Sequence, residues 1–441
     1  MGSEVAHGAV ASRHTCSVES FVVQPNGPLS GTIQVGGAKN SVLKLMAATL
    51  LCEGRHVLEN VPNILDVCVM ADVISHLGAR TQRSGLRQIV IDSPATKDVG
   101  TEAPYDLVER MRASIVVLGP LLARCGFARV SMPGGDDFGH RPVDIHLNGL
   151  SAMGAEFETS HGYIEGRVGS ATSPGRLVGA NVVLEYPSHT ATDNLVMAAV
   201  LAKGTTVIEN AAREPEVCDL ASYLRSMGAR IKGAGTSRIE VEGVDELSPA
   251  THSVVPDRVV AATYMAGVGL AGGDVVIEDA RVDHMEMLVR KMSAMGMHIE
   301  QLPEGLSVGA DSRLSSVDVS TLPYPGVATD YKPFLVTMLT VADGVGIVTE
   351  NIFGGRFRYV DELRRMGADV RTEGHHAVVR GVSRLSGAPV RAPDIRAGAA
   401  LVLAGLAAEG ETEVAGVHHI DRGYEDLARS LSSIGAHVTR R

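Results

Sequence analysis

A phrase that ends a helix recurs six times along the chain, and it constrains the fold more than any other feature. Each copy places a glycine after an amphipathic stretch and before alternating apolar residues; these glycines are Gly78, Gly154, Gly228, Gly296, Gly367 and Gly435. They lie about 70 residues apart, which is the spacing of a structural repeat. Glycine fits the left-handed cap of a helix, and the β-branched residues beyond it favour a strand.

A second phrase precedes most of these caps: an alanine-rich helix, a short glycine turn and an extended segment. It occurs at 47–60, 198–210, 266–279, 339–351 and 403–416. These helices are apolar on nearly every face, which is typical of helices buried inside a domain. We therefore expect six helix–strand–helix–strand units in an α/β protein, three in each half, with a ligand cleft where two similar lobes meet. One six-unit barrel is the alternative.

Composition excludes several classes of protein. With 441 residues, 45% of them apolar, the chain can form two large domains. Its formal net charge of −11 and 4% aromatic content argue against a general nucleic-acid binder. The five cysteines show no metal-like or disulfide spacing, and no run resembles a signal peptide or a membrane span. We expect a cytoplasmic protein without membrane contacts, in which residues 1–17 form a flexible tail.

Five cations stand near the starts of expected helices or on a glycine loop. They are Lys39, which Asn40 follows, Arg112, Arg141, Arg396 and Arg422. Any one of them alone is best explained as a solvated side chain. Because they recur at related points of the repeat, in an otherwise negative chain, we expect them to meet in one cleft. Helix starts attract anions, so the set predicts a phosphate or carboxylate site.

Six long motifs carry a family resemblance: GGAKNSVLKLMAATLL, MRASIVVLGPLLARC, PGGDDFGHRPVD, NAAREPEVCDL, DIRAGAALVLAG and HIDRGYE. In this order they resemble the enolpyruvyl transferases, above all the branch that acts on UDP-N-acetylglucosamine in peptidoglycan synthesis. The resemblance runs from about Phe21 to the C-terminus. It implies two inside-out α/β barrel domains, each of three βαβαββ repeats, with a ligand cleft between them. One domain would span 39–255 and carry the glycine loop; the other would be discontinuous, 18–38 plus 256–441.

The resemblance also implies the reaction and its residues. The enolpyruvyl group of phosphoenolpyruvate passes to a hydroxyl of a uridine nucleotide and phosphate leaves, with no metal or cofactor. Catalytic roles fall on Lys39, Asp136, Asp330 and Arg422, where Asp136 is the general acid on the glycine loop and Asp330 is the base. The positions that resemble substrate-binding ones are Asn40, Arg112, Arg141, Pro142, Val143, Asp144, His146, Ser188, Thr190, Ile352 and Arg396.

Asp136 departs from most of the family, which has cysteine at this position. A buried carboxyl group can donate a proton when a second carboxylate, such as that of Asp137, raises its pKa. Since fosfomycin alkylates the family's cysteine, we expect this protein to be insensitive to it. Covalent inactivation by fosfomycin would contradict the assignment of Asp136.

Three further departures lie at the acceptor end. Ser188-His189-Thr190 replaces the family's Ser-Val-Gly, Val327-Ala328 replaces Phe-Pro, and Gly354-Gly355 replaces a bulkier pair. The segment 141–146, which resembles the uracil-binding segment, is intact. We therefore expect the 3′-hydroxyl of UMP to be the acceptor, as in nucleoside-antibiotic biosynthesis. UDP-N-acetylglucosamine is the alternative. A non-catalytic nucleotide-binding paralogue and a shikimate-pathway relative are weaker alternatives.

Overall fold

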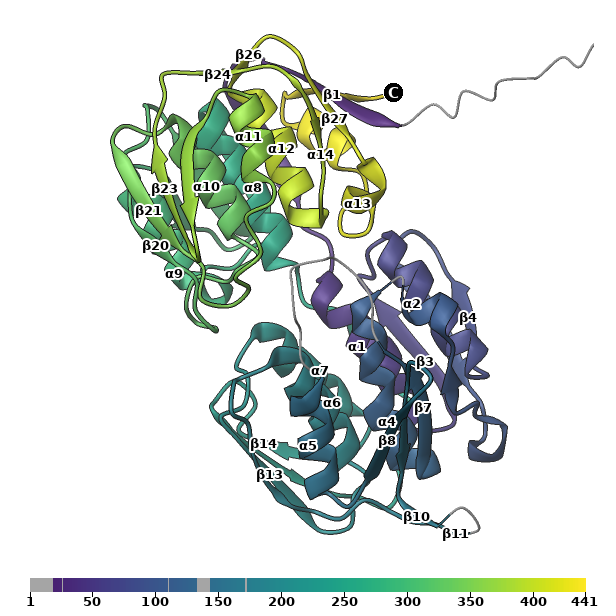
Figure 1. The fold of residues 1–441 in the computed structure, drawn as a ribbon. Helices are drawn as coiled ribbons and strands as arrows, with labels where there is room; N and C mark the ends of the chain where they lie inside the picture. The colour runs from purple at the N-terminus through teal and green to yellow at the C-terminus, as the bar shows by residue number, and fades with distance from the viewer. Residues whose placement is uncertain (1–18, 26, 110, 133–142, 171–172) are drawn as a thin grey trace, which may run out of the picture.

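The computed structural model describes residues 19–25, 27–109, 111–132, 143–170 and 173–441, and they form two lobes (Figure 1). Buried apolar side chains gather in two separate clusters. One contains residues between 42 and 254, and the other contains residues 21–35 together with residues between 259 and 438. We call the first part of the molecule lobe 1 and the second lobe 2.

Lobe 1 contains three four-stranded sheets. The first has the strand order β16 (Thr251–Ser253), β3 (Gly54–Glu59), β5 (Gln88–Ser93) and β4 (Arg80–Arg83), and the second has the order β6 (Glu102–Ala103), β7 (Phe127–Ser131), β9 (Tyr163–Arg167) and β8 (Glu156–Ser160). The third has the order β12 (Asn181–Val183), β13 (Thr205–Glu209), β15 (Arg238–Glu242) and β14 (Arg230–Lys232). Its helices are α1 (Lys39–Ala48), α2 (Leu65–His76), α3 (Tyr105–Val108), α4 (Leu118–Cys125), α5 (Asp144–Ala152), α6 (His189–Ala199) and α7 (Pro215–Ser226). Short strands β10 (Gly169–Ser170) and β11 (Ser173–Pro174) form a separate pair.

Lobe 2 also contains three four-stranded sheets. The first has the strand order β2 (Leu29–Gln34), β17 (Gly273–Glu278), β19 (Gly305–Ala310) and β18 (His298–Gln301), and the second has the order β20 (Val319–Ser320), β21 (Val345–Thr349), β23 (His376–Arg380) and β22 (Asp369–Glu373). The third has the order β25 (Pro389–Arg391), β27 (Thr412–Ala415), β1 (Ser20–Gln24) and β28 (His437–Arg440). Its helices are α8 (Arg258–Ala271), α9 (Glu286–Ala294), α10 (Lys332–Val341), α11 (Val360–Arg365), α12 (Ile395–Leu406), α13 (Val417–Asp421) and α14 (Leu427–Ser433). Strands β24 (Leu385–Ser386) and β26 (Ala408–Glu409) form a further pair.

All six four-stranded sheets share one topology. The first two strands of each, in the orders given, are parallel, and the remaining pairs are antiparallel. The alanine-rich helices lie inside the lobes as expected; every residue of α12 is buried. Because β1 and β2 complete two sheets of lobe 2, the N-terminal strands pair with segments more than 200 residues away.

The six repeat glycines follow α2, α5, α7, α9, α11 and α14, as the sequence predicts, and all have positive φ angles between 87° and 108°. A side chain on five of them would meet no atom within 4 Å. The backbone conformation, and not crowding, therefore requires glycine there. At Gly78 a Cβ atom would also lie 2.8 Å from the Asp98 carbonyl oxygen.

The chain crosses between the lobes at two adjacent segments. The Ala38 N–H donates to the Val255 carbonyl at 2.7 Å, and the Asp257 N–H donates to the Gly36 carbonyl at 2.9 Å. At Gly37 a Cβ atom would lie 1.9 Å from the Asn60 carbonyl oxygen, so only glycine fits the crossing. One expected helix differs. Residues Arg112–Val117 form a 3-10 helix, and α4 begins only at Leu118, because Pro120 lacks the N–H that an earlier α-helical turn would use.

Candidate active site

A cavity of about 550 Å³ lies between the lobes. It is lined from lobe 1 by the start of α1, the first turn of α2 and the start of α6. From lobe 2 it is lined by the segments that precede α10 and α12, the turn after β21, and the end of α13. Cations from both lobes reach it, among them Lys39 of lobe 1 and Arg396 and Arg422 of lobe 2.

Asp66 joins two of these cations across the lobes. The Lys39 Nζ lies 2.9 Å from Asp66 Oδ2, and the Arg422 Nε donates to Asp66 Oδ1 at 2.9 Å. Burial alone would raise the pKa of Asp66, but Lys39 and Arg422 hold it below its ordinary value. The carboxylate is therefore ionised and orients both cations toward the cavity.

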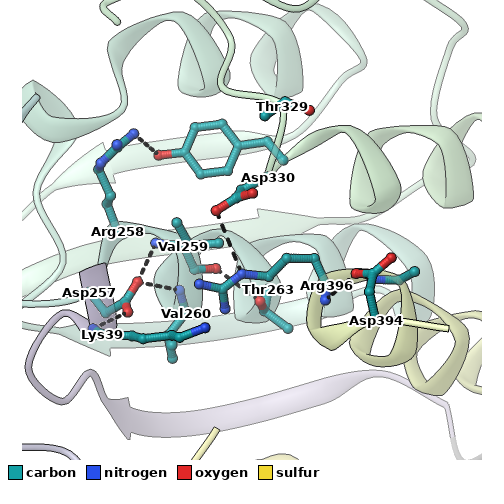
Figure 2. Close-up of polar contacts among 12 residues, drawn as sticks. Lys39, Asp257, Arg258, Val259, Val260, Thr263, Thr329, Asp330, Asp394 and Arg396 are labelled. Carbon is teal, nitrogen blue, oxygen red and sulfur yellow. Dashed lines mark hydrogen bonds and ion pairs between the residues drawn. The ribbon is translucent and has the colours of Figure 1, made fainter. Parts of the chain in front are cut away.

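Asp330 forms a second group, which lies wholly in lobe 2. Its Oδ1 accepts from Arg356 Nη1 at 2.7 Å, and its Oδ2 lies 3.8 Å from Arg396 Nε. Figure 2 shows Asp330 facing Arg396, with Lys39 on the far side of that guanidinium. Burial opposes ionisation of Asp330, but the two guanidinium groups outweigh burial and hold its pKa well below the usual range.

Lys39 is fixed at its backbone as well as at its side chain. Asp257 accepts the Lys39 N–H through Oδ2 at 2.9 Å, while its Oδ1 caps α8 by accepting from Val259 and Val260 (Figure 2). Burial lowers the pKa of the Lys39 ammonium, and Arg396 and Arg422 lower it further, whereas Asp66 raises it. Lys39, the first residue of α1, therefore places its ammonium group where the two lobes meet.

The start of α6 forms another wall. Ser188 caps this helix by accepting the Ala191 N–H at 3.4 Å, and His189 and Thr190 line the cavity beside it. Behind them lies the buried Asp193, whose Oδ2 is 3.3 Å from His189 Nε2 and 3.6 Å from Lys44 Nζ. Burial lowers the pKa of His189 to about 3 and raises that of Asp193 to about 7.

Arg258 is a second residue of lobe 2 that holds a residue of lobe 1. Its Nε lies 2.9 Å from Glu216 Oε1, and its Nη1 donates to the Tyr331 hydroxyl at 3.0 Å. The Arg258 and Glu216 side chains are both buried. Burial alone would raise the pKa of Glu216, but the neighbouring Arg258 guanidinium lowers it to about 2. Arg258 therefore connects α7 to the residue that follows Asp330.

The structure brings part of the predicted site together. The predicted residues that line the cavity are Lys39, Asn40, Ser188, Thr190, Asp330, Ile352, Arg396 and Arg422. Val143, Asp144 and His146 do not line it; His146 is buried behind Thr190, with its Nε2 3.5 Å from the Thr190 hydroxyl. Asp136, Arg141 and Pro142 lie outside the described residues, as does the Arg112 side chain.

Sequence reasoning missed Asp66 and Arg356, although each contacts a predicted residue. Asp66 stands in the mostly apolar stretch LDVCVMADV, on the buried face of the helix, where a carboxylate needs a cation; the second carboxylate, Asp72, lies on the exposed face. Arg356 directly follows Gly354-Gly355, where the departure from the family's pattern concerns only the size of the two side chains. Asp66 could have been recognised from burial periodicity. The contact of Arg356 with Asp330 joins two loops and has no local signal.

Within the described parts of the chain, no group of three or more His, Cys, Asp or Glu side chains could hold a metal ion. The helices of the same residues include none that is long and apolar enough to cross a membrane.

Known proteins match this chain over nearly its whole length. The family model "EPSP synthase (3-phosphoshikimate 1-carboxyvinyltransferase)" matches residues 23–431. UDP-N-acetylglucosamine 1-carboxyvinyltransferase 1 of Caldanaerobacter subterraneus subsp. tengcongensis is 47% identical over 422 residues, which cover 96% of this chain and 99% of the relative. The UDP-N-acetylglucosamine 1-carboxyvinyltransferase of Granulibacter bethesdensis is 50% identical over 414 residues, covering 94% and 97%.

Solved structures show the same fold. The enolpyruvyl transferase NikO from Streptomyces tendae superposes with a TM-score of 0.84 at 24% identity, covering 96% of this chain and 98% of that chain. EPSP synthase from Acinetobacter baumannii superposes with a TM-score of 0.72 at 19% identity, covering 96% and 100%. The predicted fold class and enzyme class are confirmed: this chain is an enolpyruvyl transferase and belongs to the EPSP synthase family.

Proposed function

We propose that the protein transfers the enolpyruvyl group of phosphoenolpyruvate to UDP-N-acetylglucosamine and releases phosphate. The observation that carries the proposal is the convergence of Lys39, Arg396 and Arg422, from both lobes, on one cavity. The relatives at 47% and 50% identity favour UDP-N-acetylglucosamine over UMP, the acceptor expected from the departures at the acceptor end. NikO, at 24% identity, informs only the fold.

Phosphoenolpyruvate carries a phosphate and a carboxylate, so it needs several fixed cations. Lys39 and Arg422 already share one carboxylate, Asp66, while Arg396 approaches another, Asp330. We assign these three to the donor, together with Arg112 and Arg141, which stay sequence predictions. Each charge-assisted hydrogen bond to the donor contributes about 1.5–3 kcal/mol. Closure of the lobes would exclude water and strengthen these contacts.

Asp330 is our candidate base, although its pKa is depressed by two guanidinium groups. A carboxylate held by Arg356 and Arg396 is a weak base. The donor's anionic groups compete for the Arg396 guanidinium and bring negative charge close to Asp330, so donor binding would weaken this ion pair and raise the pKa of Asp330. On this view the base becomes effective only when the donor is in place.

The reaction then follows in two stages. Asp330 takes the proton of the acceptor hydroxyl as its oxygen attacks C2 of phosphoenolpyruvate, and a general acid adds a proton to C3. The C2–O bond to phosphate then breaks, and loss of a proton from C3 restores the double bond. Asp136 stays the predicted acid, outside the described residues. The cations stabilise the departing phosphate.

Phosphate release from phosphoenolpyruvate, measured in parallel with UDP-N-acetylglucosamine and with UMP, tests the proposal. We expect the larger kcat/KM with UDP-N-acetylglucosamine. A larger value with UMP would transfer the proposal to the shorter nucleotide. No release with either acceptor, despite measurable nucleotide binding, would favour the non-catalytic paralogue and contradict the proposal.

A further inference from the structure

Lys332 is a fully buried cation two residues beyond the candidate base. It is the first residue of α10, and neither its side chain nor that of its partner Glu350 is exposed to solvent. The sequence gives no reason for a charge here, because α10 is mostly apolar and is buried from Lys332 to Thr340. Burying an ammonium group costs free energy unless every N–H finds a partner.

The Lys332 ammonium has three such partners. Its Nζ lies 2.9 Å from Glu350 Oε2, donates to the Arg356 carbonyl oxygen, and lies 3.9 Å from the centroid of the Phe357 ring. The two oxygen atoms can accept two of its three N–H donors, and the aromatic ring stabilises the charge as a cation–π partner. All three partners belong to the segment between β21 and α11. Lys332 therefore fixes that segment against the start of α10.

Glu350 organises the turn that follows β21. Its Oε1 accepts the N–H groups of Ile352 at 2.8 Å and Phe353 at 3.0 Å, and the Thr321 hydroxyl at 2.8 Å. Its Oε2 accepts the Thr329 hydroxyl at 2.7 Å, in addition to the contact with Lys332. The backbone of the turn thus wraps around one carboxylate, whose charge Lys332 neutralises.

The network ends at the candidate base. The Thr329 hydroxyl donates to Glu350 and accepts from Arg356 Nη1 at 3.1 Å. The same Nη1 donates to Asp330 Oδ1 at 2.7 Å. Lys332 thereby acts on Arg356 in two ways, by holding its backbone carbonyl and, through Glu350 and Thr329, by holding its guanidinium.

We propose that Lys332, through its buried pair with Glu350, is a positioning residue that sets the place of Arg356 against Asp330 and so tunes the base of the reaction. This rests on the proposed function, in which Asp330 takes the acceptor proton. Lys332 does not line the cavity, so it touches neither substrate. Its effect must pass through the residues that do.

The test compares Lys332→Met and Lys332→Gln with the unmodified enzyme. Methionine leaves Glu350 without its cation, whereas the glutamine amide can still donate to Glu350 and to the Arg356 carbonyl. We expect kcat to fall by about 100-fold in Lys332→Met, the size of effect that a small misplacement of a reacting group can have. In Lys332→Gln we expect a loss of less than about tenfold, and in both variants smaller changes in either KM than in kcat.

Two readouts separate positioning from stability. Arg124→Met is a matched control, since Arg124 is a half-buried cation of lobe 1 that donates to the carbonyls of Leu50 and Pro94, away from the cavity. It should lower the melting temperature without changing kcat. In an Asp330→Asn background, Lys332→Met should reduce the residual rate no further, because the two residues act through one step.

The pH profile gives a third readout. Burial lowers the pKa of Lys332 to about 8 against the opposing effect of Glu350; Arg356 lowers it further and Asp394 raises it. We expect kcat to decline above pH 8 in the unmodified enzyme and this decline to disappear in Lys332→Gln. Lys332 variants that fold and keep kcat within about twofold would overturn the proposal, as would an equal further loss in the Asp330→Asn background. If Asp330→Asn itself kept full activity, the proposed function would fail instead.

Discussion

Two carboxylates, the buried Asp66 and the partly buried Asp330, each hold two cations of the cavity, but they do so in different places. The cations on Asp66 come from both lobes, Lys39 from lobe 1 and Arg422 from lobe 2. The cations on Asp330 are Arg356 and Arg396, and both come from lobe 2. The Asp66 group therefore depends on how the lobes sit together, whereas the Asp330 group survives any movement between them.

Exposure separates the two carboxylates as well. The side chain of Asp66 is 2% exposed, and that of Asp330 is 24% exposed. Although Asp66 lies at the cavity wall, a carboxylate with so little exposed surface can orient cations but offers almost no surface to a ligand's proton. The comparison assigns a structural role to Asp66 and a chemical role to Asp330, although neighbouring cations lower the pKa of both.

Asp330→Asn should have the largest effect. The amide keeps the size of the side chain but cannot accept the acceptor proton, so we expect kcat to fall by about 10²–10⁴-fold with smaller changes in nucleotide affinity. Phosphate release and nucleotide titration measure the two quantities. Asp311→Asn, at an exposed carboxylate of lobe 2, is the control and should be unaffected. A drop in affinity without a drop in kcat would make Asp330 a binding residue.

Asp66→Asn should act on binding instead of chemistry. Without the shared carboxylate, Lys39 and Arg422 lose their common orientation, and we expect KM for phosphoenolpyruvate to rise about tenfold, the equivalent of one weakened charge-assisted hydrogen bond. The unliganded enzyme should also be more extended in small-angle scattering, because one interlobe contact is lost. Asp72→Asn, on the exposed face of the same helix, is the control. If kcat fell as far as in Asp330→Asn, the division of roles would be wrong.

The features that could be predicted from the sequence are those that repeat along the chain or depend on neighbouring residues. The cap glycines, the buried alanine-rich helices and the helix-start position of Lys39 each depend on a few neighbouring residues. The predicted meeting of Lys39, Arg396 and Arg422 required the repeat and the resemblance together. The acceptor was the weakest inference, since the departures at Ser188-His189-Thr190 favoured UMP whereas the relatives favour UDP-N-acetylglucosamine.

Contacts between distant loops could not be predicted in the same way. Arg356 reaches Asp330 only because Glu350 and Lys332 fix the turn that carries it, and no pattern within that turn indicates the contact. Asp66 meets Arg422 across 356 positions of sequence and across the two lobes. Such pairs depend on how finished elements pack, which periodicity and spacing do not specify.

A third carboxylate, Asp193, is fully buried, and its substitution has the smallest expected effect. It has one cation, Lys44, at 3.6 Å, and neither of its oxygens accepts a hydrogen bond among the described residues. Burial therefore prevails and raises its pKa to about 7, the opposite of the direction at Asp66 and Asp330.

Between the unfolded pKa of about 3.9 and the folded value near 7, the native chain holds one proton more than the unfolded chain. The stability that this proton contributes is complete below the unfolded pKa and is lost as pH rises through 7, by at most about 1.4 kcal/mol per pH unit. Asp193→Asn should remove that slope, because the amide stays neutral throughout. His189, whose pKa is lowered to about 3 in the folded chain, takes up a proton at about pH 6.5 in the unfolded chain and so adds a slope of opposite sign. Both proteins contain His189, so its contribution cancels in the difference between them. Urea unfolding at pH 5, 6, 7 and 8 measures the difference between the two proteins. If the free energy of unfolding changed with pH in the same way in both proteins, Asp193 would be ionised throughout, as Asp66 and Asp330 are. One cation would then suffice to keep a buried carboxylate ionised.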